Sequence, residues 1–468
     1  MNTEDIQVNF SDKAHEECGV LGFYDVDGHS VAHEIYHGLY ALQHRGQESC
    51  GIATNDDGRI HQVKDKGMVN EVFNETNLGS LVGNIGVGHV RYARSNEPRE
   101  NAQPLVSRYC KGSLTLAHNG SITNVDSLRE HLESNGAIFQ STNDTEVIMH
   151  LIAIARTTSH SVEAAALSVM DKLEGAYSMI LMSPRKLMGI RDPQGFHPLC
   201  IGKKGNSYIL ASETCALDTM RAEFVRDVEP GEIVLIEGTK LTSIKDKCNK
   251  KPSLCVFEYM YFARPDSVID GVSVYETRIN TGKLLAKAAP VQADFVMGVP
   301  DSGLNFAQGY AMESGIPYGE GLIRNRYTGR TFIKHTQAER VAAVNIKLNA
   351  LASAVNGKRI IMVDDSIVRG TTCANIIKML KDKGAKEVHL RIASPPFLFP
   401  CYFGTDIPSK KELIANRYSV EEIRKLVGAD SLAYLPVTDV NNIGLRKDFG
   451  YCSACFTGKY PIKVKAED

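Results

Sequence analysis

The stretch GKRIIMVDDSIVRGTTCANIIKMLKDKGAKEVHLRIA, residues 357–393, decides the fold of the second half of the chain. Its apolar run Ile-Ile-Met-Val predicts a buried strand, and Ile376, Ile377 and Leu380 share one face of the helix expected after it. Gly384 ends that helix before a second apolar strand. A strand, a helix and a strand in this order predict a parallel, doubly wound sheet, whose ligands bind at the carboxyl ends of the strands.

Two acids follow the first of these strands, and a loop rich in small hydroxyl residues leads from them into the helix. Backbone N–H groups at a helix start suit a dianionic phosphate. Carboxylates suit the hydroxyls of a ribose and a hydrated magnesium ion. The alternative is a strand that ends in helix-capping acids. The candidate residues for a sugar phosphate are Asp364, Asp365, Ser366, Arg369, Gly370, Thr371 and Thr372.

A second loop, GVPDSG at 298–303, follows another apolar strand and is a weak turn signal by itself. The basic run RNRYTGRTFIKHTQAER at 324–340 lies between the two loops and would ordinarily be a solvated face. Taken together, these features resemble the type I phosphoribosyltransferases. The resemblance implies that the residues named above bind phosphoribosylpyrophosphate, with Pro300 and Asp301 in a pyrophosphate loop and Ser302 in contact with magnesium. It also implies that the basic run is a mobile loop that closes over the substrate and excludes water.

Short β-rich runs separated by glycine turns fill the first half, and helical segments around Val31–Gln43 and Thr145–Ala155 interrupt them. Many closely spaced strands predict an α+β domain with sheet-on-sheet packing. Asp144 precedes the second helix as its expected N-cap. A polar, lysine-rich stretch from Lys240 to Lys251 predicts a domain boundary. The expected strands are CGVLGFY (18–24), GNIGVGHVRYA (83–93), LTLAHNG (114–120), YSMILMSP (177–184) and VEPGEIVLI (228–236).

Cys18 opens the first of these strands, where a cysteine is usually a small buried hydrophobe. Later motifs supply what hydrolysis of an amide by a thiol needs. Arg91 is either a satisfied strand-end arginine or a bidentate clamp for an α-carboxylate. Asn119 and Gly120 form either a hairpin turn or the donor pair of an oxyanion hole. Asp144 either caps its helix or accepts a substrate ammonium.

The motifs Cys-Gly, His-Arg-Gly, Val-Arg-Tyr, His-Asn-Gly and Asn-Asp-Thr-Glu occur in this order across the first half. Their joint occurrence resembles the glutaminase domain of the N-terminal-nucleophile amidotransferases, which has a layered αββα fold. The resemblance implies that Cys18 is the nucleophile and that Arg91 and Asp144 clamp glutamine. It also implies that Asn119 and Gly120 form the oxyanion hole.

In that family the nucleophile is the first residue of the mature chain, so residues 1–17 are expected to be a propeptide removed between Glu17 and Cys18. A freed α-amine, of reference pKa about 7.7–8.0, can take the proton of a thiol of reference pKa about 8.5. No separate histidine base is then required. The thioester formed on Cys18 would release ammonia and then be hydrolysed to glutamate.

Four cysteines of the second half form a further group, of which the last two make a C-x-x-C motif. Four thiolates can hold a tetrahedral zinc ion or a four-iron cluster, and their spacing does not decide between the two. The four positions match the cluster-bearing branch of the amidotransferases related to the enzyme of Bacillus, which implies a structural four-iron four-sulfur cluster. These residues are Cys255, Cys401, Cys452 and Cys455.

Composition limits the classes of protein that remain. A chain of 468 residues suits two or three domains, and a formal net charge of −2 lacks the basic excess that binds nucleic acid or membrane surfaces. The acidic leader has no apolar run and no stretch reaches the ~20 apolar residues of a membrane span. Eleven cysteines, an odd number, argue against a disulfide framework. The expected location is the cytoplasm.

Taken together, both halves resemble the amidophosphoribosyltransferase family over nearly the whole chain. The resemblance implies a glutaminase domain at 18–250 and a phosphoribosyltransferase domain at 251–468. Ammonia made at Cys18 would pass through an internal channel to C1 of phosphoribosylpyrophosphate, giving phosphoribosylamine, glutamate and pyrophosphate at the first step of de novo purine synthesis. Magnesium, a homotetramer and feedback inhibition by purine nucleotides are implied as well.

Three other functions would each use part of this set of residues. A non-catalytic phosphoribosyl-binding regulator of purine genes would not need Cys18 and its clamps. An electron carrier would use the cluster without glutamine turnover. A hexosamine synthase would share the nucleophile but not the segment Asp364–Thr372.

Three positions depart from the pattern of the resembled family. Arg94 stands where small hydroxyl residues are usual, His197 precedes a proline where arginine is usual, and Asn345 stands where arginine is expected. None of them removes a group with an assigned chemical step.

Overall fold

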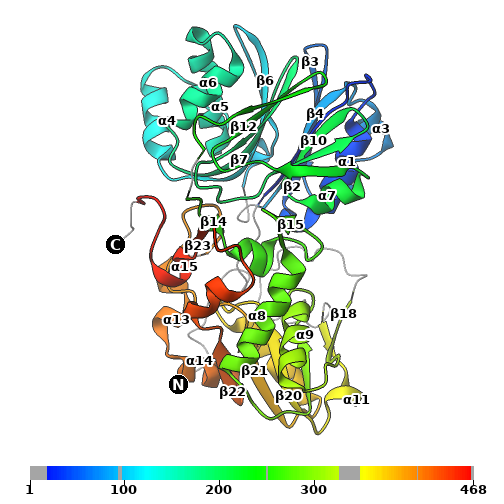
Figure 1. The fold of residues 1–468 in the computed structure, drawn as a ribbon, viewed down its shortest axis with the longest axis vertical. Coiled ribbons are helices and arrows are strands. Elements are labelled where there is room, and N and C mark those ends of the chain that lie inside the picture. Colours follow the sequence, from blue (N-terminus) through cyan, green and yellow to red (C-terminus); the bar gives the residue numbers. More distant parts are fainter. Residues whose placement is uncertain (1–17, 93–96, 249–250, 326–347, 408, 465–468) are drawn as a thin grey trace.

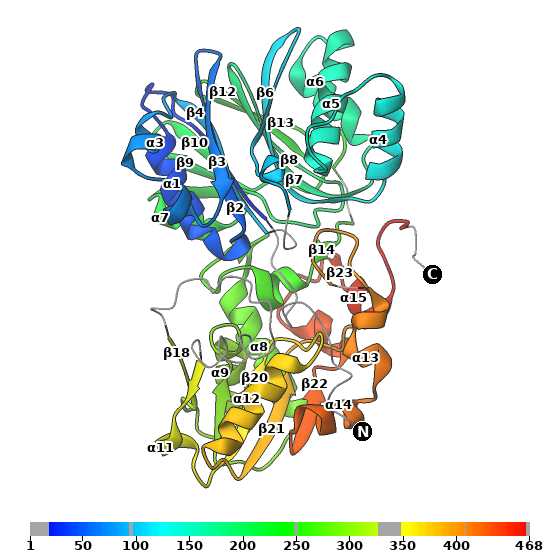
Figure 2. The ribbon, with the colours of Figure 1, turned by 180° about the vertical axis from the view of Figure 1, so that it is seen from behind.

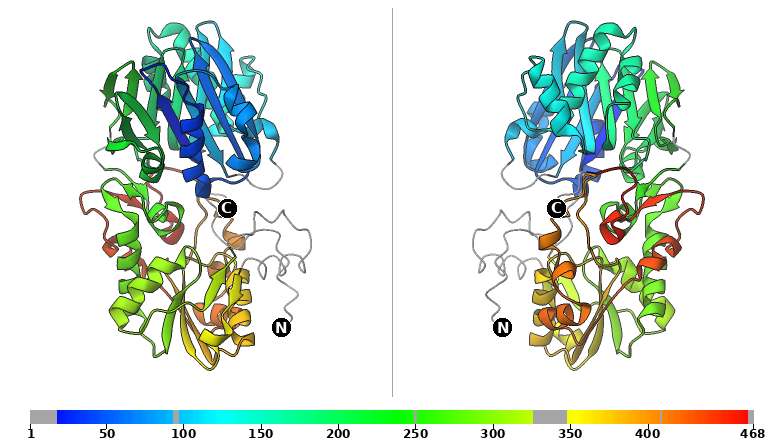
Figure 3. Two further views of the ribbon diagram at one scale, coloured as in Figure 1. Left: turned by 90° about the vertical axis from the view of Figure 1, so that its right-hand side faces the viewer. Right: turned by 90° about the vertical axis from the view of Figure 1, so that its left-hand side faces the viewer.

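The computed structural model describes residues 18–92, 97–248, 251–325, 348–407 and 409–464. Its first and second halves lie end to end along the long axis of the molecule (Figures 1 and 3). Buried ion pairs join them, including Arg191 with Asp270 at 2.8 Å and Arg45 with Glu258 at 2.8 Å. Among the described residues, no helix is long and apolar enough to cross a membrane.

Two antiparallel sheets stack on each other in the first half. The seven-stranded sheet has the order β11-β9-β10-β1-β4-β2-β3, and the six-stranded sheet has the order β13-β12-β8-β7-β6-β5. The strands of the first are β1 (Gly19–Tyr24), β2 (Ser49–Asp56), β3 (Arg59–Lys66), β4 (Ile85–Arg91), β9 (Cys200–Lys204), β10 (Ser207–Ala211) and β11 (Glu223–Asp227). Those of the second are β5 (Leu105–Tyr109), β6 (Gly112–Ile122), β7 (Gly175–Ser183), β8 (Lys186–Arg191), β12 (Ile233–Glu237) and β13 (Lys240–Ile244).

Helices cover both outer faces of this sandwich (Figure 1). Val20 and Val87 of one sheet pack with Ile180 of the other to form the core between the sheets. Each outer face packs under helices and forms a further core. On the first sheet, for example, Leu21 of β1 packs with Leu39 of α1. The helices are α1 (Ala32–Ala41), α2 (Val69–Val72), α3 (Glu75–Gly79), α4 (Val125–Ser134), α5 (Asp144–Thr158), α6 (Val162–Met170) and α7 (Thr214–Thr219), with 3-10 turns at Gln43–Arg45 and Arg99–Asn101. The expected αββα layering is confirmed.

A four-stranded parallel sheet forms the centre of the second half, in the order β17-β20-β21-β22. Residues of β20 alternate between two helix layers, because Ile361 and Val363 pack toward α8 and α9, whereas Ile360 and Met362 pack toward α12 and α14. Figure 2 shows α12 lying over β20 and β21. The strands are β17 (Phe295–Gly298), β20 (Arg359–Asp364), β21 (Glu387–Ile392) and β22 (Ser431–Tyr434); the helices are α8 (Val274–Ala288), α9 (Gly303–Ser314), α12 (Thr371–Asp382) and α14 (Val420–Val427).

The expected strand-helix-strand unit is therefore confirmed, with Gly384 at φ +90° just beyond the end of α12. Smaller elements complete this half. They are the strand pairs β14 (Leu254–Cys255) with β23 (Tyr451–Cys452), β15 (Val268–Ile269) with β16 (Val272–Ser273), and β18 (Leu322–Arg324) with β19 (Leu348–Ala350); the π-helix η4 (Glu258–Phe262); the helices α11 (Ala352–Val355), α13 (Ile414–Arg417) and α15 (Ala454–Thr457); and 3-10 turns at Lys410–Glu412 and Val437–Asn442.

Candidate functional site

Cys18 lies directly before β1, next to the carboxyl end of β4. Gly19 pairs with Val90 across these two strands, so Cys18 stands beside Arg91 and Tyr92. The Cys18 Sγ atom lies 3.9 Å from the carbonyl oxygen of Tyr92, and the Nε atom of Arg45 donates to the carbonyl of Cys18 at 3.1 Å. The residue is half-buried rather than a core hydrophobe.

Asn119 and Gly120 lie inside strand β6 and not in a hairpin turn. They pair with Ser178 and Tyr177 of β7, so the alternative of a turn is wrong. Gly120 has a φ of +136°, and a Cβ atom there would stand 2.2 Å from the carbonyl oxygen of Ala176. Only glycine fits this backbone without strain.

The side-chain amide of Asn119 has an unusual environment. It is buried, and neither its Oδ1 nor its Nδ2 atom has a hydrogen-bond partner among the described residues. An unpaired buried polar group costs about 1–3 kcal/mol, so such groups generally call for a missing partner such as a ligand. A substrate oxyanion bound here would accept a hydrogen bond from the Nδ2 atom of Asn119.

Arg91 already holds a carboxylate. Its Nη2 and Nε atoms donate to Oε2 of Glu97 at 2.7 and 3.3 Å, and Nδ2 of Asn101 reaches the same oxygen at 3.1 Å. Burial by itself would lower the pKa of Arg91, but the negative charges of Cys18, Glu97 and Asp144 outweigh burial and raise that pKa. Arg91 is thus a permanent cation close to Cys18, and its guanidinium is paired with the carboxylate of Glu97.

Asp144 is not the N-cap of helix α5. The cap is Asn143, whose side chain accepts from the backbone N–H of Thr145 at 3.0 Å, so the sequence expectation is wrong by one residue. The carboxylate of Asp144 instead accepts from the N–H of Ile122 at 3.1 Å and lies 3.5 Å from Nδ1 of His118. Burial opposes ionisation, but His118, the Ile122 N–H and Arg91 outweigh it and lower the pKa of Asp144. An ionised carboxylate suits an ammonium ligand.

The structure therefore brings Cys18, Arg91 and Asp144 close together, and it sets His118, the residue before Asn119 in β6, beside Asp144. Sequence reasoning did not assign roles to His118 or Glu97. His118 was visible as part of the His-Asn-Gly motif, whereas the pairing of Glu97 with Arg91 had no local signal.

A second cluster of polar residues lies at the carboxyl ends of β17 and β20. Asp364, Asp365 and Ser366 are buried there, although two of them are acids. Asp365 accepts from the hydroxyl of Ser366 at 2.6 Å and from the hydroxyl of Ser302, which follows β17. The backbone N–H of Asp365 donates to Asp364 Oδ1 at 3.0 Å. Both predicted loops thus meet at one edge of the sheet, where ligands of parallel sheets bind.

The loop after Ser366 leads to the N-terminus of α12. Gly370, at φ +89°, is the N-cap and offers no side chain, so the first turn of the helix, with Thr371 and Thr372, has no side-chain cap. Such a helix start presents N–H groups and positive dipole charge to an anion. Arg369 pairs with Glu412 at 2.7 Å at the rim.

The loop after β17 is fixed against the same strand edge. The N–H of Val299 donates to the carbonyl of Val363 at 2.9 Å, which places Pro300 and Asp301 near the end of β20. Asp301 forms an ion pair with Arg324 of β18. The rest of the expected mobile loop, residues 326–340, lies outside the described residues, as do Arg94 and Asn345.

Four cysteines surround an enclosed pocket between the two halves. Pairing of β14 with β23 sets Cys255 opposite Cys452. Cys401 and Cys455 line the same pocket, together with the aromatic rings of Phe196 and Phe403. Burial, followed by the neighbouring Cys401 and Cys452, raises the pKa of Cys455.

The distances between these thiols bear on the kind of metal group that they could hold. In the described residues, the one set of three or more His, Cys, Asp or Glu ligand atoms that all lie within 4.8 Å of one another is Asp25, Asp27 and His29. No three of the four cysteine sulfurs are therefore that close, whereas a single zinc ion with Zn–S bonds of about 2.3 Å brings its sulfurs within about 3.8 Å. The four cysteines supply soft thiolate donors around one apolar pocket, a donor set of the kind that thiolate-bound metal groups use.

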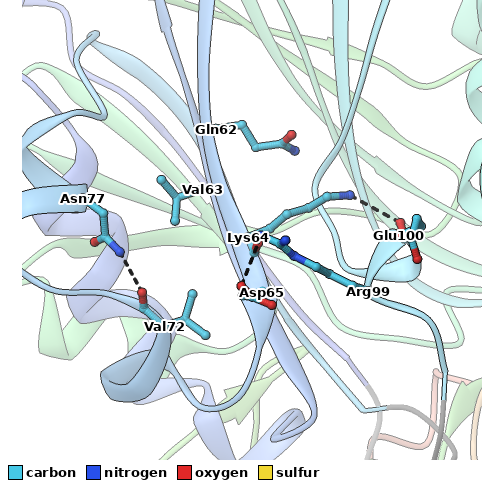
Figure 4. A pocket seen from close by; sticks show the side chains of 8 residues that line it. All are labelled: Gln62, Val63, Lys64, Asp65, Val72, Asn77, Arg99 and Glu100. Carbon is cyan, nitrogen blue, oxygen red and sulfur yellow. Dashed lines mark hydrogen bonds and ion pairs between the residues drawn. The ribbon is translucent and has the colours of Figure 1, made fainter.

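A hollow of about 530 Å³ on the outer side of β3 contains none of the predicted site residues (Figure 4). Its polar side chains bind one another and nearby backbone: Lys64 donates to the carbonyl of Ala102 at 2.6 Å, and Arg99 pairs with Asp65 at 3.1 Å. Burial, more than its charged neighbours, lowers the pKa of Lys64 to about 8. Since these groups are satisfied internally, the hollow does not compete with the two clusters as a reaction site.

Comparison with known proteins matches each half to one domain family. A glutamine amidotransferase domain matches residues 89–219, and a phosphoribosyl transferase domain matches residues 280–393. The amidophosphoribosyltransferase of Archaeoglobus fulgidus is 47% identical over 96% of this chain and 99% of its own. That of Bacillus subtilis is 46% identical over 96% of this chain and 95% of its own. The chain belongs to the amidophosphoribosyltransferase family.

Solved structures of this family have the same fold over nearly the whole length. One, described as the glutamine phosphoribosylpyrophosphate amidotransferase of B. subtilis complexed with ADP and GMP, has a TM-score of 0.89 and 45% identity, covering 96% of this chain and 98% of that one. Another, described as the allosteric regulatory enzyme of purine biosynthesis, has a TM-score of 0.90, 45% identity and coverages of 96% and 97%. The chain is an enzyme of purine biosynthesis, with a glutamine amidotransferase half and a phosphoribosyltransferase half.

Proposed function

We propose that this chain makes ammonia from glutamine at Cys18 and transfers it to C1 of phosphoribosylpyrophosphate at the edge of β17 and β20. The observation that carries the proposal is the buried amide of Asn119, which has no partner among the described residues, in a chain that also brings Arg91 close to Cys18 and Asp144 and sets acids before the N-terminus of α12. The two clusters lie in different halves, so each half performs one part of the reaction.

In the first part, the Cys18 thiolate attacks the amide carbon of glutamine, and the amide oxygen becomes an oxyanion. Asn119 Nδ2 and the Gly120 N–H donate to that oxyanion. Asp144 receives the α-ammonium of glutamine, and Arg91 receives its α-carboxylate once Glu97 has given up its place. Collapse of the intermediate breaks the C–N bond and releases ammonia, and water then cleaves the thioester to give glutamate.

Removal of residues 1–17 would supply the proton acceptor. The freed α-amine of Cys18 takes the thiol proton and passes it to the departing nitrogen. The leader lies outside the described residues, so this step rests on the resemblance.

In the second part, the ribose hydroxyls bind the carboxylates of Asp364 and Asp365, and the 5-phosphate binds the loop from Ser366 to Thr372. Pro300 and Asp301 face the pyrophosphate. A magnesium ion bound at Ser302, Asp364 and Asp365 would neutralise the pyrophosphate leaving group. Ammonia that reaches C1 through an internal channel forms the new C–N bond with inversion as the C–O bond to pyrophosphate breaks.

A four-iron four-sulfur cluster held by Cys255, Cys401, Cys452 and Cys455 is proposed as a structural group that ties the C-terminal segment to the rest of the second half. A homotetramer and inhibition by purine nucleotides are proposed from the family, in which the B. subtilis structure is described with ADP and GMP. The cytoplasmic location stays a prediction from the sequence.

Replacing Cys18 tests whether the two halves perform separate parts of the reaction. Cys18→Ala is expected to abolish phosphoribosylamine synthesis from glutamine and to leave synthesis from free ammonia. The reaction of free ammonia needs only the polar residues at the carboxyl ends of β17 and β20. Both activities are measured on one preparation, with intact mass to check the start of the chain and an iron assay to check the cysteine pocket. Glutaminase activity that survives in Cys18→Ala would refute the proposal.

A further inference from the structure

A buried chain of polar contacts connects the main chain of Cys18 to the second half. Arg45 has no exposed surface; it donates through Nε to the Cys18 carbonyl at 3.1 Å. Its Nη1 and Nη2 atoms donate to both carboxylate oxygens of Glu258 at 3.0 and 2.8 Å. A bidentate pair of this kind fixes orientation as well as distance. The position of the Cys18 carbonyl is therefore set by a residue of η4, at the start of the second half.

His197 extends this chain to the cysteine pocket. Its ring is fully buried, with Nδ1 3.4 Å from Oε1 of Glu258 and Nε2 2.8 Å from the carbonyl oxygen of Phe403. Both ring nitrogens thus face oxygen atoms, and arginine was expected at this position. The backbone carbonyl of His197 accepts from Ser178 Oγ at 3.1 Å and Arg191 Nε at 2.8 Å.

The segment that His197 holds also touches the other side of the glutamine site. A Cβ atom on Gly404 would stand 3.3 Å from the Cα atom of Gly120 and 3.3 Å from Nε2 of His197. Phe403, one residue earlier, stacks on Phe196 with ring centroids 4.2 Å apart. The segment 401–404 thus packs against Gly120, the glycine whose N–H is proposed to donate in the oxyanion hole.

We propose that His197 is a positioning residue of the glutamine site. It acts through Glu258 and Arg45 on the main chain of Cys18, and through Phe403 and Gly404 on Gly120. The inference rests on the proposed function of these two residues and goes beyond it, because it assigns to a non-reacting side chain the relative placement of nucleophile and oxyanion hole.

The placement matters because an error of about 1 Å between reacting groups costs about 100-fold in rate. His197→Phe keeps a flat ring of similar size but removes both polar contacts. It is expected to lower kcat for glutamine-dependent synthesis about tenfold, with little change in the KM for glutamine, since Arg91 and Asp144 are untouched. Synthesis from free ammonia stays within about twofold of the wild type, because it bypasses Cys18.

Two further readouts do not depend on turnover. The rate at which a diazoketone analogue of glutamine alkylates Cys18 falls about tenfold in His197→Phe, because the same placement governs that reaction. Iron per chain stays equal to that of the wild type. His197→Gln can still donate to the Phe403 carbonyl, so its alkylation rate is expected to lie between those of the wild type and His197→Phe. If His197→Phe does not fold, His197→Gln provides the test.

His389→Phe is the matched control, because His389 is also buried but bonds to Ser431 and Glu387 at the far end of the second half. His389→Phe is expected to have the same ratio of glutamine-dependent to ammonia-dependent synthesis as the wild type. An unchanged alkylation rate in His197→Phe and His197→Gln overturns the inference, and so does an equal loss of both activities or a loss of iron, which would mark a structural role only. Failure of the wild-type chain itself to use glutamine would instead overturn the proposed function.

Discussion

Asn119 is the residue whose surroundings point most directly to a missing ligand. Its side-chain amide is buried in β6 without a partner among the described residues. Asn119→Ala is expected to lower kcat for glutamine-dependent synthesis by about 100- to 1,000-fold, as loss of one oxyanion donor does. Ammonia-dependent synthesis is expected to be unchanged. Steady-state assays with both nitrogen donors check this, with the exposed Asn135→Ala as control.

An equal loss with both donors would contradict the oxyanion role of Asn119, because free ammonia needs no amide hydrolysis. A normal kcat with glutamine would contradict it as well.

Asp365 makes the corresponding prediction for the second cluster. Its carboxylate is buried and accepts from two serine hydroxyls, which orient it toward the strand edge. Asp365→Asn keeps the shape but removes the charge, and it is expected to raise the KM for phosphoribosylpyrophosphate roughly 10- to 100-fold, equivalent to one charge-assisted hydrogen bond. The effect should be the same with glutamine and with ammonia. Asp382→Asn, on the exposed end of α12, is the control, and an unchanged KM in Asp365→Asn would discard its ligand role.

The N-terminus of α12 makes a prediction about an element rather than a side chain. Gly370 caps this helix at φ +89°, and Gly357 adopts φ +71° in a turn with open space around it. Alanine at either position should cost about 1–2 kcal/mol of stability, because both backbones are left-handed. Only Gly370→Ala should also raise the KM for phosphoribosylpyrophosphate, since it reshapes the phosphate loop.

Thermal unfolding and steady-state kinetics of the two glycine variants measure these effects separately. If Gly357→Ala raised the KM as much as Gly370→Ala, the loop before α12 would not be the phosphate site.

The sequence predicted elements where hydrophobic period and turn residues agree, as in β20, α12 and β21. It failed where a local signal had two outcomes. Asn119–Gly120 is a strong turn signal, yet long-range pairing of β6 with β7 holds it in a strand. At the start of α5, Asn143 and Asp144 are both good caps, and only the fold shows that Asp144 turns to Ile122 and His118.

At the scale of the whole molecule, buried charges hold the halves together. Glu213 accepts from Arg45 at 2.7 Å and from the hydroxyl of Ser267 at 2.7 Å, so it links the first half to the second. Burial opposes its ionisation, but His44 and Arg45 outweigh burial and lower the pKa of Glu213 well below the ordinary 4.5. Its folded state therefore binds a proton less readily than its unfolded state.

The sign of the pH effect follows from that difference. The stability that Glu213 contributes is present above about pH 4.5 and is lost as the pH falls toward its lowered folded-state pKa. Glu213→Gln is expected to lower the free energy of unfolding at pH 7 by about 3–5 kcal/mol and to flatten its fall in acid. Urea unfolding across a pH series checks both effects. An equally steep fall in the variant would contradict the assignment.

This inter-half network had no signal in the sequence. Arg45, His197, Glu213 and Glu258 are far apart in the chain and follow no shared period, so only the packed fold brings them together. His197 was visible solely as a departure from the resembled family, and its contacts supply a physical reason for a buried polar group at that position.

The central claim is that ammonia released from glutamine at Cys18 reacts at the site of Asp364 and Asp365 within the same protein. The most direct measurement gives the processed wild-type chain amide-¹⁵N glutamine and phosphoribosylpyrophosphate in the presence of excess unlabelled ammonium. The account predicts ¹⁵N on C1 of the phosphoribosylamine at close to full enrichment, because the ammonia does not leave the molecule. Product that carries mainly unlabelled nitrogen, or no product from glutamine, would contradict it.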